Sequence, residues 1–139
     1  MFGSSKYGVT PITAEKLENS WYEFYAISKK LTNEHITSSM IWGSQYDATL
    51  NWALKGKDSN KVLDTNGIGN NSSGKISLSG AYDNDSINNI KDLGGNLLEW
   101  TLEASTQYHR IRRGGSYKEV RSPAYRWTDG IGSRSSVLR

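Results

Sequence analysis

The sequence feature that most constrains the fold is a long stretch, residues 56–92, in which Gly, Ser, Asn and Asp predominate. Its apolar residues come only in short groups, at 61–63, 75–78 and 87–90, with neither helical nor strand periodicity over a longer run. This pattern predicts a long loop region with one or two short strands. A chain of 139 residues has room for one domain. We therefore expect a single domain over residues 1–139, with a small core held by aromatic residues and wrapped in long loops.

Two amphipathic helices are predicted before the loop region. The first covers 13–31, with Thr13 as a partial cap. Its apolar stripe consists of Leu17, Trp21, Phe24 or Tyr25, Ser28 and Leu31. The second covers 43–54 and ends at Gly56; its stripe consists of Tyr46, Leu50, Ala53 and Leu54. The segment 37–42 between them is ambiguous.

Short β-type segments are predicted after the loop region. They cover 97–102, 108–113, 125–127 and 133–138. Helices followed by loops and late strands predict an α+β fold. Aliphatic residues are scarce, but five Trp and eight Tyr supply large buried areas, and a net charge of +3 is too small to keep the chain unfolded.

The chain contains no cysteine, which excludes disulfides, thiolate metal sites and cysteine nucleophiles. It also lacks a run of about 20 apolar residues such as a membrane span needs. The first residues, MFGSSKYG, have no signal-peptide core. We expect a chain without a membrane span or signal peptide.

The basic residues are unevenly distributed. Every Arg lies within 108–139, whereas the preceding part has only Lys and more acidic than basic residues. Such a basic segment can bind nucleic acid or another anion. Arg is equally suited to hold loops and carboxylates inside a fold. The spacing favours the second role over nucleic acid as a partner.

Three patterns carry weaker chemical signals. Residues 69–75 match the glycine and lysine positions of a phosphate-binding loop, but Ile76 stands where the loop needs a hydroxyl, so a plain polar loop is favoured. His35 and His109 lack carboxylates placed to complete a metal set. The third pattern is an oxygen-rich group that suits either calcium or turns: Asp83, Asn84, Asp85, Asn88, Asn89 and Asp92.

The most specific motifs lie from residue 92 onward: GNLLEW, RGGSY, YRW and GSR, in this order. Their order and spacing resemble the formylglycine-generating-enzyme (sulfatase-modifying factor) family, a branch of the C-type-lectin-like fold. Segment 18–52 also resembles the N-terminal helices of a phage and prophage subgroup. The resemblance implies a C-type-lectin-like fold with two N-terminal helices, short antiparallel strands and long loops. In that family two cysteines bind copper and activate oxygen; Glu119 and Ala124 stand at the matching positions, so neither copper nor the oxidase activity is expected here.

The same resemblance implies a structural calcium site. Its ligands would be the carboxylates of Asp92 and Glu99 and the backbone carbonyls of Gly95 and Leu97. The alternative is that Glu99 pairs with an arginine such as Arg113 while Asp92 caps a turn.

The resemblance also implies the structural role for Arg113, Arg126 and Arg134. It leaves open whether Arg110, Arg112 and Arg121 form an exposed anion-binding face.

Because the oxidase activity is not expected here, the resemblance implies that the chain is a scaffold for binding. Related proteins include the variable proteins of diversity-generating retroelements, which are diversified after the GGS motif. The corresponding face here would contain Tyr117, Lys118, Glu119, Val120, Arg121, Trp127, Thr128, Asp129 and Ile131. Tyr and Trp are suited to such a face because they offer rigid contact area, although Trp127 could instead belong to the core.

The function expected from this resemblance is that of a phage, prophage or bacterial surface protein binding a protein or glycan on a target surface. A structural module of a virion or surface assembly, including a homo-oligomer, is one alternative. An enzyme of other chemistry is the second, and it predicts a pocket that collects carboxylates with perturbed pKa values near Glu99 or Glu119.

Overall fold

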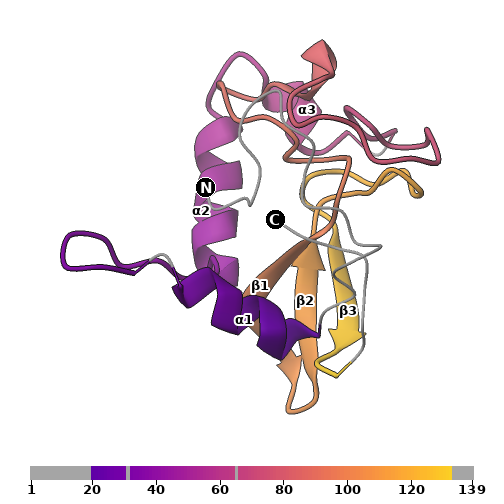
Figure 1. Cartoon of the computed structure of the whole chain (residues 1–139). Helices are drawn as coiled ribbons and strands as arrows, with labels where there is room; N and C mark the ends of the chain where they lie inside the picture. The colour runs from indigo at the N-terminus through magenta and orange to yellow at the C-terminus, as the bar shows by residue number, and fades with distance from the viewer. Residues whose placement is uncertain (1–19, 31, 65, 133–139) are drawn as a thin grey trace.

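The computed structural model describes residues 20–30, 32–64 and 66–132. Its elements are, in chain order, α1 (Trp21–Lys29), α2 (Gly43–Ala53), α3 (Ser59–Val62), the 3-10 turn η2 (Asp83–Asp85), β1 (Glu99–Thr106), β2 (His109–Arg113) and β3 (Arg126–Gly130). The strands form one antiparallel sheet in the order β1-β2-β3. Figure 1 shows α2 beside the sheet, α1 across its front and most loops gathered above it. This arrangement confirms the mixed α+β prediction.

The first helix is shorter than predicted. Ser20 is extended, with ψ of 165°, and its backbone N–H donates to the Glu23 carboxylate at 2.6 Å. Because this polar cap fixes the start at Trp21, the prediction that the helix begins near Thr13 was wrong. Trp21 and Phe24 are buried as the stripe predicts, while Thr13 and Leu17 lie outside the described residues.

The second helix is confirmed over almost its whole predicted length. Tyr46, Leu50 and Ala53 are buried, whereas Leu54, just beyond the helix, is exposed. The three buried side chains form a core cluster with Val62 of α3 and three loop residues: Ile68, Ile87 and Leu93. The Tyr46 hydroxyl donates to the backbone carbonyl of Leu93 at 3.0 Å. Helix α2 therefore anchors the loop region to the rest of the domain.

A second core cluster joins α1 to the sheet. It contains Trp21, Phe24, Met40 and Trp100. Trp21 Nε1 donates to the backbone carbonyl of Thr101 at 2.8 Å, so this aromatic side chain is both packed and hydrogen-bonded. The ambiguous segment 37–42 forms no helix or strand, and the Leu102 amide donates to the Ile41 carbonyl at 2.9 Å.

Consecutive arginines on β2 point to opposite faces of the sheet, because side chains alternate along a strand. Arg113 lies over the ring of Tyr46 and forms an ion pair with Asp47 of α2 at 2.6 Å. Arg112 lies over the ring of Trp100, on the other face. The sequence left open whether Arg112 is exposed; only 8% of its surface is accessible, so it is buried.

Two further charged residues, Arg126 and Glu103, complete the link between α2 and the sheet. Asp47 also pairs with Arg126, and Glu103 of β1 pairs with Arg126 at 3.2 Å and lies 3.8 Å from Arg113. The two arginines therefore join α2, β1, β2 and β3, as their predicted structural role requires. Arg134 lies outside the described residues.

The stretch 56–92 is a loop region, as predicted. Within its described residues the regular structure consists of α3, η2 and an isolated bridge between Ile87 and Ile90. The apolar pieces at 61–63 and 75–78 form no strand. Of the late β segments, β1, β2 and β3 appear with shifted ends, and 133–138 lies outside the described residues. No helix within the described ranges has the length and apolar character needed to cross a membrane.

Candidate functional site

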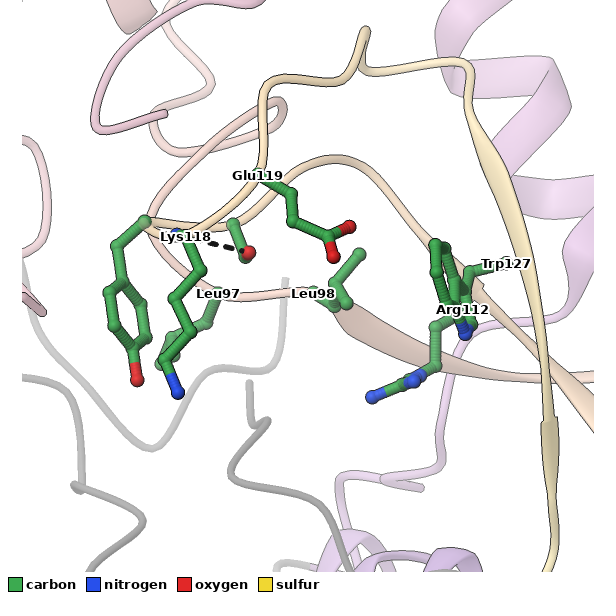
Figure 2. A pocket seen from close by; sticks show the side chains of 8 residues that line it. Leu97, Leu98, Arg112, Lys118, Glu119 and Trp127 are labelled. Carbon is green, nitrogen blue, oxygen red and sulfur yellow. Dashed lines mark hydrogen bonds between the residues drawn. The ribbon is translucent and has the colours of Figure 1, made fainter. Parts of the chain in front are cut away.

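A small open hollow lies where the 116–121 loop meets the sheet. Its volume is about 170 Å³. The lining residues are Leu97, Leu98, Arg112, Ser116, Tyr117, Lys118, Glu119 and Trp127. Figure 2 shows the Glu119 side chain pointing from the loop toward Arg112 and Trp127 of the sheet, with Lys118 at the opposite side of the hollow. Four of the nine residues predicted for the binding face, Tyr117, Lys118, Glu119 and Trp127, thus share one hollow.

The loop owes its shape to a tight turn and two glycines. The backbones of Ser116 and Glu119 exchange two hydrogen bonds of 3.2 Å. Gly114 has a φ of +76°, a conformation that favours glycine. A Cβ on Gly115 would lie 2.7 Å from the Gly94 carbonyl oxygen, so this position has no room for a side chain. The RGGSY motif therefore fixes where residues 116–119 emerge from the sheet.

A buried asparagine supports the loop from below. The Asn96 carbonyl accepts a hydrogen bond from the Tyr117 amide at 2.9 Å, and its side-chain oxygen accepts one from the Ser77 amide at 3.0 Å. The Asn70 carbonyl accepts from the Asn96 amide at 2.7 Å. Asn96 is fully buried and has a φ of +65°. Sequence reasoning missed this role of Asn96, although the residue stands inside the GNLLEW motif.

Arg112 forms the charged wall of the hollow. Its guanidinium lies 5.2 Å from the Trp100 ring centroid and pairs with Asp129 of β3. Burial lowers the pKa of Arg112, an effect opposed by the negative charges of Asp129 and Glu119. Sequence reasoning missed the contribution of Arg112, Ser116, Leu97 and Leu98 to the hollow. The usable signal was the position of Arg112 two residues before the GGS turn and directly before the structural Arg113.

The other predicted face residues surround the hollow. Arg121 lies over the ring of Tyr125 at 4.9 Å and 3.8 Å from Glu119, and Val120 is partly exposed. Thr128 is exposed on β3, and Asp129 holds Arg112. Ile131 instead packs against the cluster of Trp21 and Trp100. Trp127 is partly accessible and lines the hollow rather than the core.

The two positions that the sequence resemblance aligns with copper-binding cysteines, Glu119 and Ala124, have different surroundings. Glu119 lines the hollow and is exposed, whereas Ala124 packs against the core cluster around Tyr46. Their side chains, a carboxylate and a methyl group, cannot supply a thiolate.

The four predicted calcium ligands lie in and next to the turn 92–98. Asp92 is buried, and its Oδ2 accepts hydrogen bonds from the Ser79 hydroxyl at 2.5 Å and the Gly80 amide at 3.1 Å. The Gly95 carbonyl accepts from the Leu97 amide at 2.8 Å. These bonds show that Asp92 holds a turn, as the alternative interpretation states. All four predicted ligand groups are oxygens, which suits calcium, and the calcium site stays a prediction.

Glu99 keeps some exposed surface, but its carboxyl oxygen Oε2 is buried. Burial raises the pKa of Glu99 to about 8; a hydrogen bond from Tyr46 and the charge of Arg113 lower it, while the charge of Asp85 raises it. Arg113 thus acts on Glu99 through its charge, while its close ion pair is with Asp47. The carboxylate that lines the hollow is Glu119, so the structure does not bring Glu99 to the hollow.

The weaker motifs lie elsewhere. Residues 69–75 form bends followed by further loop, which agrees with a polar loop. His35 and His109 are both exposed, His35 beside Glu34 and His109 beside Thr106. In the ranges that the structure covers, no group of three or more His, Cys, Asp or Glu side chains comes together as a metal site. No family model, curated protein or solved structure matches the chain.

Proposed function

We propose that this chain is a non-catalytic domain of the C-type-lectin-like class that binds a ligand or receptor through the 116–121 loop and Trp127. The observation that carries the proposal is the hollow formed by Tyr117, Lys118, Glu119 and Trp127. These residues combine rigid aromatic area with charges of both signs, the composition of a specific binding face. A loop presented by a rigid sheet is also where binding residues concentrate.

The proposed setting is a phage, prophage or bacterial surface assembly, with a protein or glycan on a target surface as ligand. Diversification of the loop by a retroelement is part of this proposal, supported by the placement of most predicted variable residues at or around the hollow. The lack of catalysis is supported by Glu119 and Ala124 at the positions of the family's essential cysteines. Calcium held by Asp92, Glu99 and the carbonyls of Gly95 and Leu97 would brace the turn beneath the loop.

The test compares two tyrosines. The protein is applied to a panel of immobilised peptides and glycans, and each ligand found is titrated against Tyr117→Ala and Tyr108→Ala. Tyr108 is 65% exposed at the turn between β1 and β2, away from the hollow, and serves as the matched control. We expect the Kd to rise about tenfold or more for Tyr117→Ala and to stay unchanged for Tyr108→Ala. Equal affinities for both variants, or equal losses, would contradict the proposal.

A structural role in a larger assembly has its own supporting observation. Ile36 and Trp42 are 58% and 55% exposed, and Trp42 lines a second hollow of about 330 Å³ with residues of the 37–45 segment. Exposed apolar groups of this kind can form an interface between chains. Sedimentation at increasing protein concentration tests this role. An assembly that Trp42→Ala abolishes would favour it, and a monomer at all concentrations would count against it.

A further inference from the structure

The charges around the hollow are almost completely paired. Asp129 pairs with Arg112, and Glu119 lies 3.8 Å from Arg121. Lys118 forms no ion pair within the described part of the chain; its ammonium lies 5.4 Å from the centre of the Tyr117 ring. The hollow therefore has one positive charge without a carboxylate partner.

Arg112 meets the hollow with a largely buried side chain. Its Nη2 is engaged by Asp129, but the buried Nε has no hydrogen-bond partner among the described residues. This Nε is enclosed by the protein, so a ligand meets Arg112 through the small part of the side chain that is exposed at the hollow. In Figure 2 the Arg112 guanidinium and the Lys118 ammonium extend toward the same side of the hollow.

The remaining surface is apolar. Leu97 and Leu98 lie between the two cationic side chains, and Trp127 stands beside Arg112. A volume of about 170 Å³ suits a single side chain rather than a large ligand. An aliphatic stem can lie against leucine and tryptophan while its charged end meets the donors.

We propose that the hollow binds one acidic side chain, of the glutamate type, from a protein ligand, with its carboxylate between the Lys118 ammonium and the Arg112 guanidinium. This inference rests on the proposed binding function and specifies its ligand chemistry. A single negative charge matches the single unpaired positive charge of Lys118. A phosphate would bring a charge of about −1.5 to −2 close to Glu119 and Asp129 and would be repelled more strongly.

The experiment is an NMR titration of the full chain with the peptide acetyl-Gly-Glu-Gly-amide. The signals followed are the Arg112 Nε–H group and the backbone amides of residues 116–121. The matched ligand is acetyl-Gly-Gln-Gly-amide, which has the same shape without the charge. The variant is Lys118→Ala, and Lys55→Ala, also at an exposed position, is its control. Inorganic phosphate and 3′-sialyllactose are titrated separately.

We expect the glutamate peptide to shift these signals and the glutamine peptide to bind about tenfold more weakly. The glutamate peptide should also bind about tenfold more weakly to Lys118→Ala, and its affinity for Lys55→Ala should equal that for the wild type. Equal binding of the two peptides, insensitivity to Lys118→Ala, or a stronger response to phosphate or sialyllactose would overturn the inference. If the glutamate peptide does not bind while the affinity of ligands from the panel still depends on Tyr117, the binding function stands. In that case only the proposal of an acidic ligand is refuted. If those ligands are also insensitive to Tyr117→Ala, the binding function fails as well.

Discussion

Arg112 and Arg113 are neighbours on one strand, yet they serve two different regions of the molecule. Arg113 is 1% exposed and lies between the sheet and α2, where Tyr46, Asp47 and Glu103 surround it. Arg112 is 8% exposed and borders the hollow. Both side chains keep buried nitrogens without a hydrogen-bond partner among the described residues, Nε of Arg112 and Nε and Nη1 of Arg113. The difference teaches that burial alone does not assign a role to an arginine. What distinguishes the two is position: Arg113 lies between the sheet and α2, whereas Arg112 borders the hollow, where a ligand can reach its side chain.

The largest effect is expected at Arg113. Arg113→Ala should lower the free energy of unfolding by about 3 to 5 kcal/mol, because it removes a buried partner of Asp47 and leaves a gap against Tyr46. Arg126→Ala is the control: Arg126 binds the same two carboxylates but is about half exposed, so its loss should cost less than about 1 kcal/mol. Urea unfolding measures both values. Similar losses for the two variants would show that Arg113 has no special structural role.

The second prediction concerns Glu99, which faces Arg113 across the β1–β2 pair. Its pKa is about 8 in the folded chain and 4.5 for the ordinary group, so the folded state binds more protons between these values. Stability should therefore be greatest near pH 5 and fall as the pH rises toward 8, by at most about 1.4 kcal/mol per pH unit. The pKa of Asp58 is shifted in the opposite direction: a hydrogen bond from the Asn88 amide and the nearby Lys61 lower it from its ordinary value of 3.8. The stability that Asp58 contributes is therefore lost only as the pH falls below this value.

Unfolding measured at several pH values, with Glu99→Gln as the comparison, checks this window. The variant should show a flatter profile than the wild type. A wild-type free energy of unfolding that stays constant or rises from pH 5 to 8 would refute the claim that the Glu99 carboxyl group is buried and protonated in the folded chain.

Calcium should reverse this dependence if it occupies the predicted site, because the ion would hold Glu99 in its charged form. At pH 7.5 the melting temperature should rise by a few degrees in about 1 mM calcium and fall in EDTA. Asp92→Asn should remove the response. Identical melting curves with calcium and with EDTA would contradict the prediction of a calcium site.

A smaller stability effect is expected at Arg112. Arg112→Met keeps a side chain of similar length against Trp100, and the Asp129 left behind retains its hydrogen bond from the Gly130 amide. The free energy of unfolding should fall by only about 1 kcal/mol. Binding of the glutamate peptide should nevertheless be lost. A loss of stability as large as that of Arg113→Ala would remove the contrast between the two faces.

The sequence predicted the parts of the fold that local pattern controls. The stripe of Tyr46, Leu50 and Ala53 identified α2, and the Gly-rich composition identified the 56–92 loops. The start of α1 was misplaced because the capping pair Ser20 and Glu23 was overlooked in favour of an earlier cap.

The site was predicted less completely. The loop residues Tyr117 to Glu119 follow the GGS motif directly, so their position could be anticipated. The burial of Arg112 and the support from Asn96 could not, because both depend on contacts between segments far apart in the chain. Asn96, for example, joins the loop at Tyr117 to Asn70 and Ser77.

The central claim is that the face around Arg112 binds while the face around Arg113 stabilises. The most direct test measures ligand affinity and unfolding free energy together for Trp127→Ala and Trp52→Ala. Trp52 is 53% exposed on α2, is not among the residues that line the hollow, and offers the same change of side chain. We predict that Trp127→Ala weakens binding about tenfold or more and that Trp52→Ala leaves it unchanged, with both variants folded. Wild-type affinity in Trp127→Ala, or an equal loss in Trp52→Ala, would contradict the account.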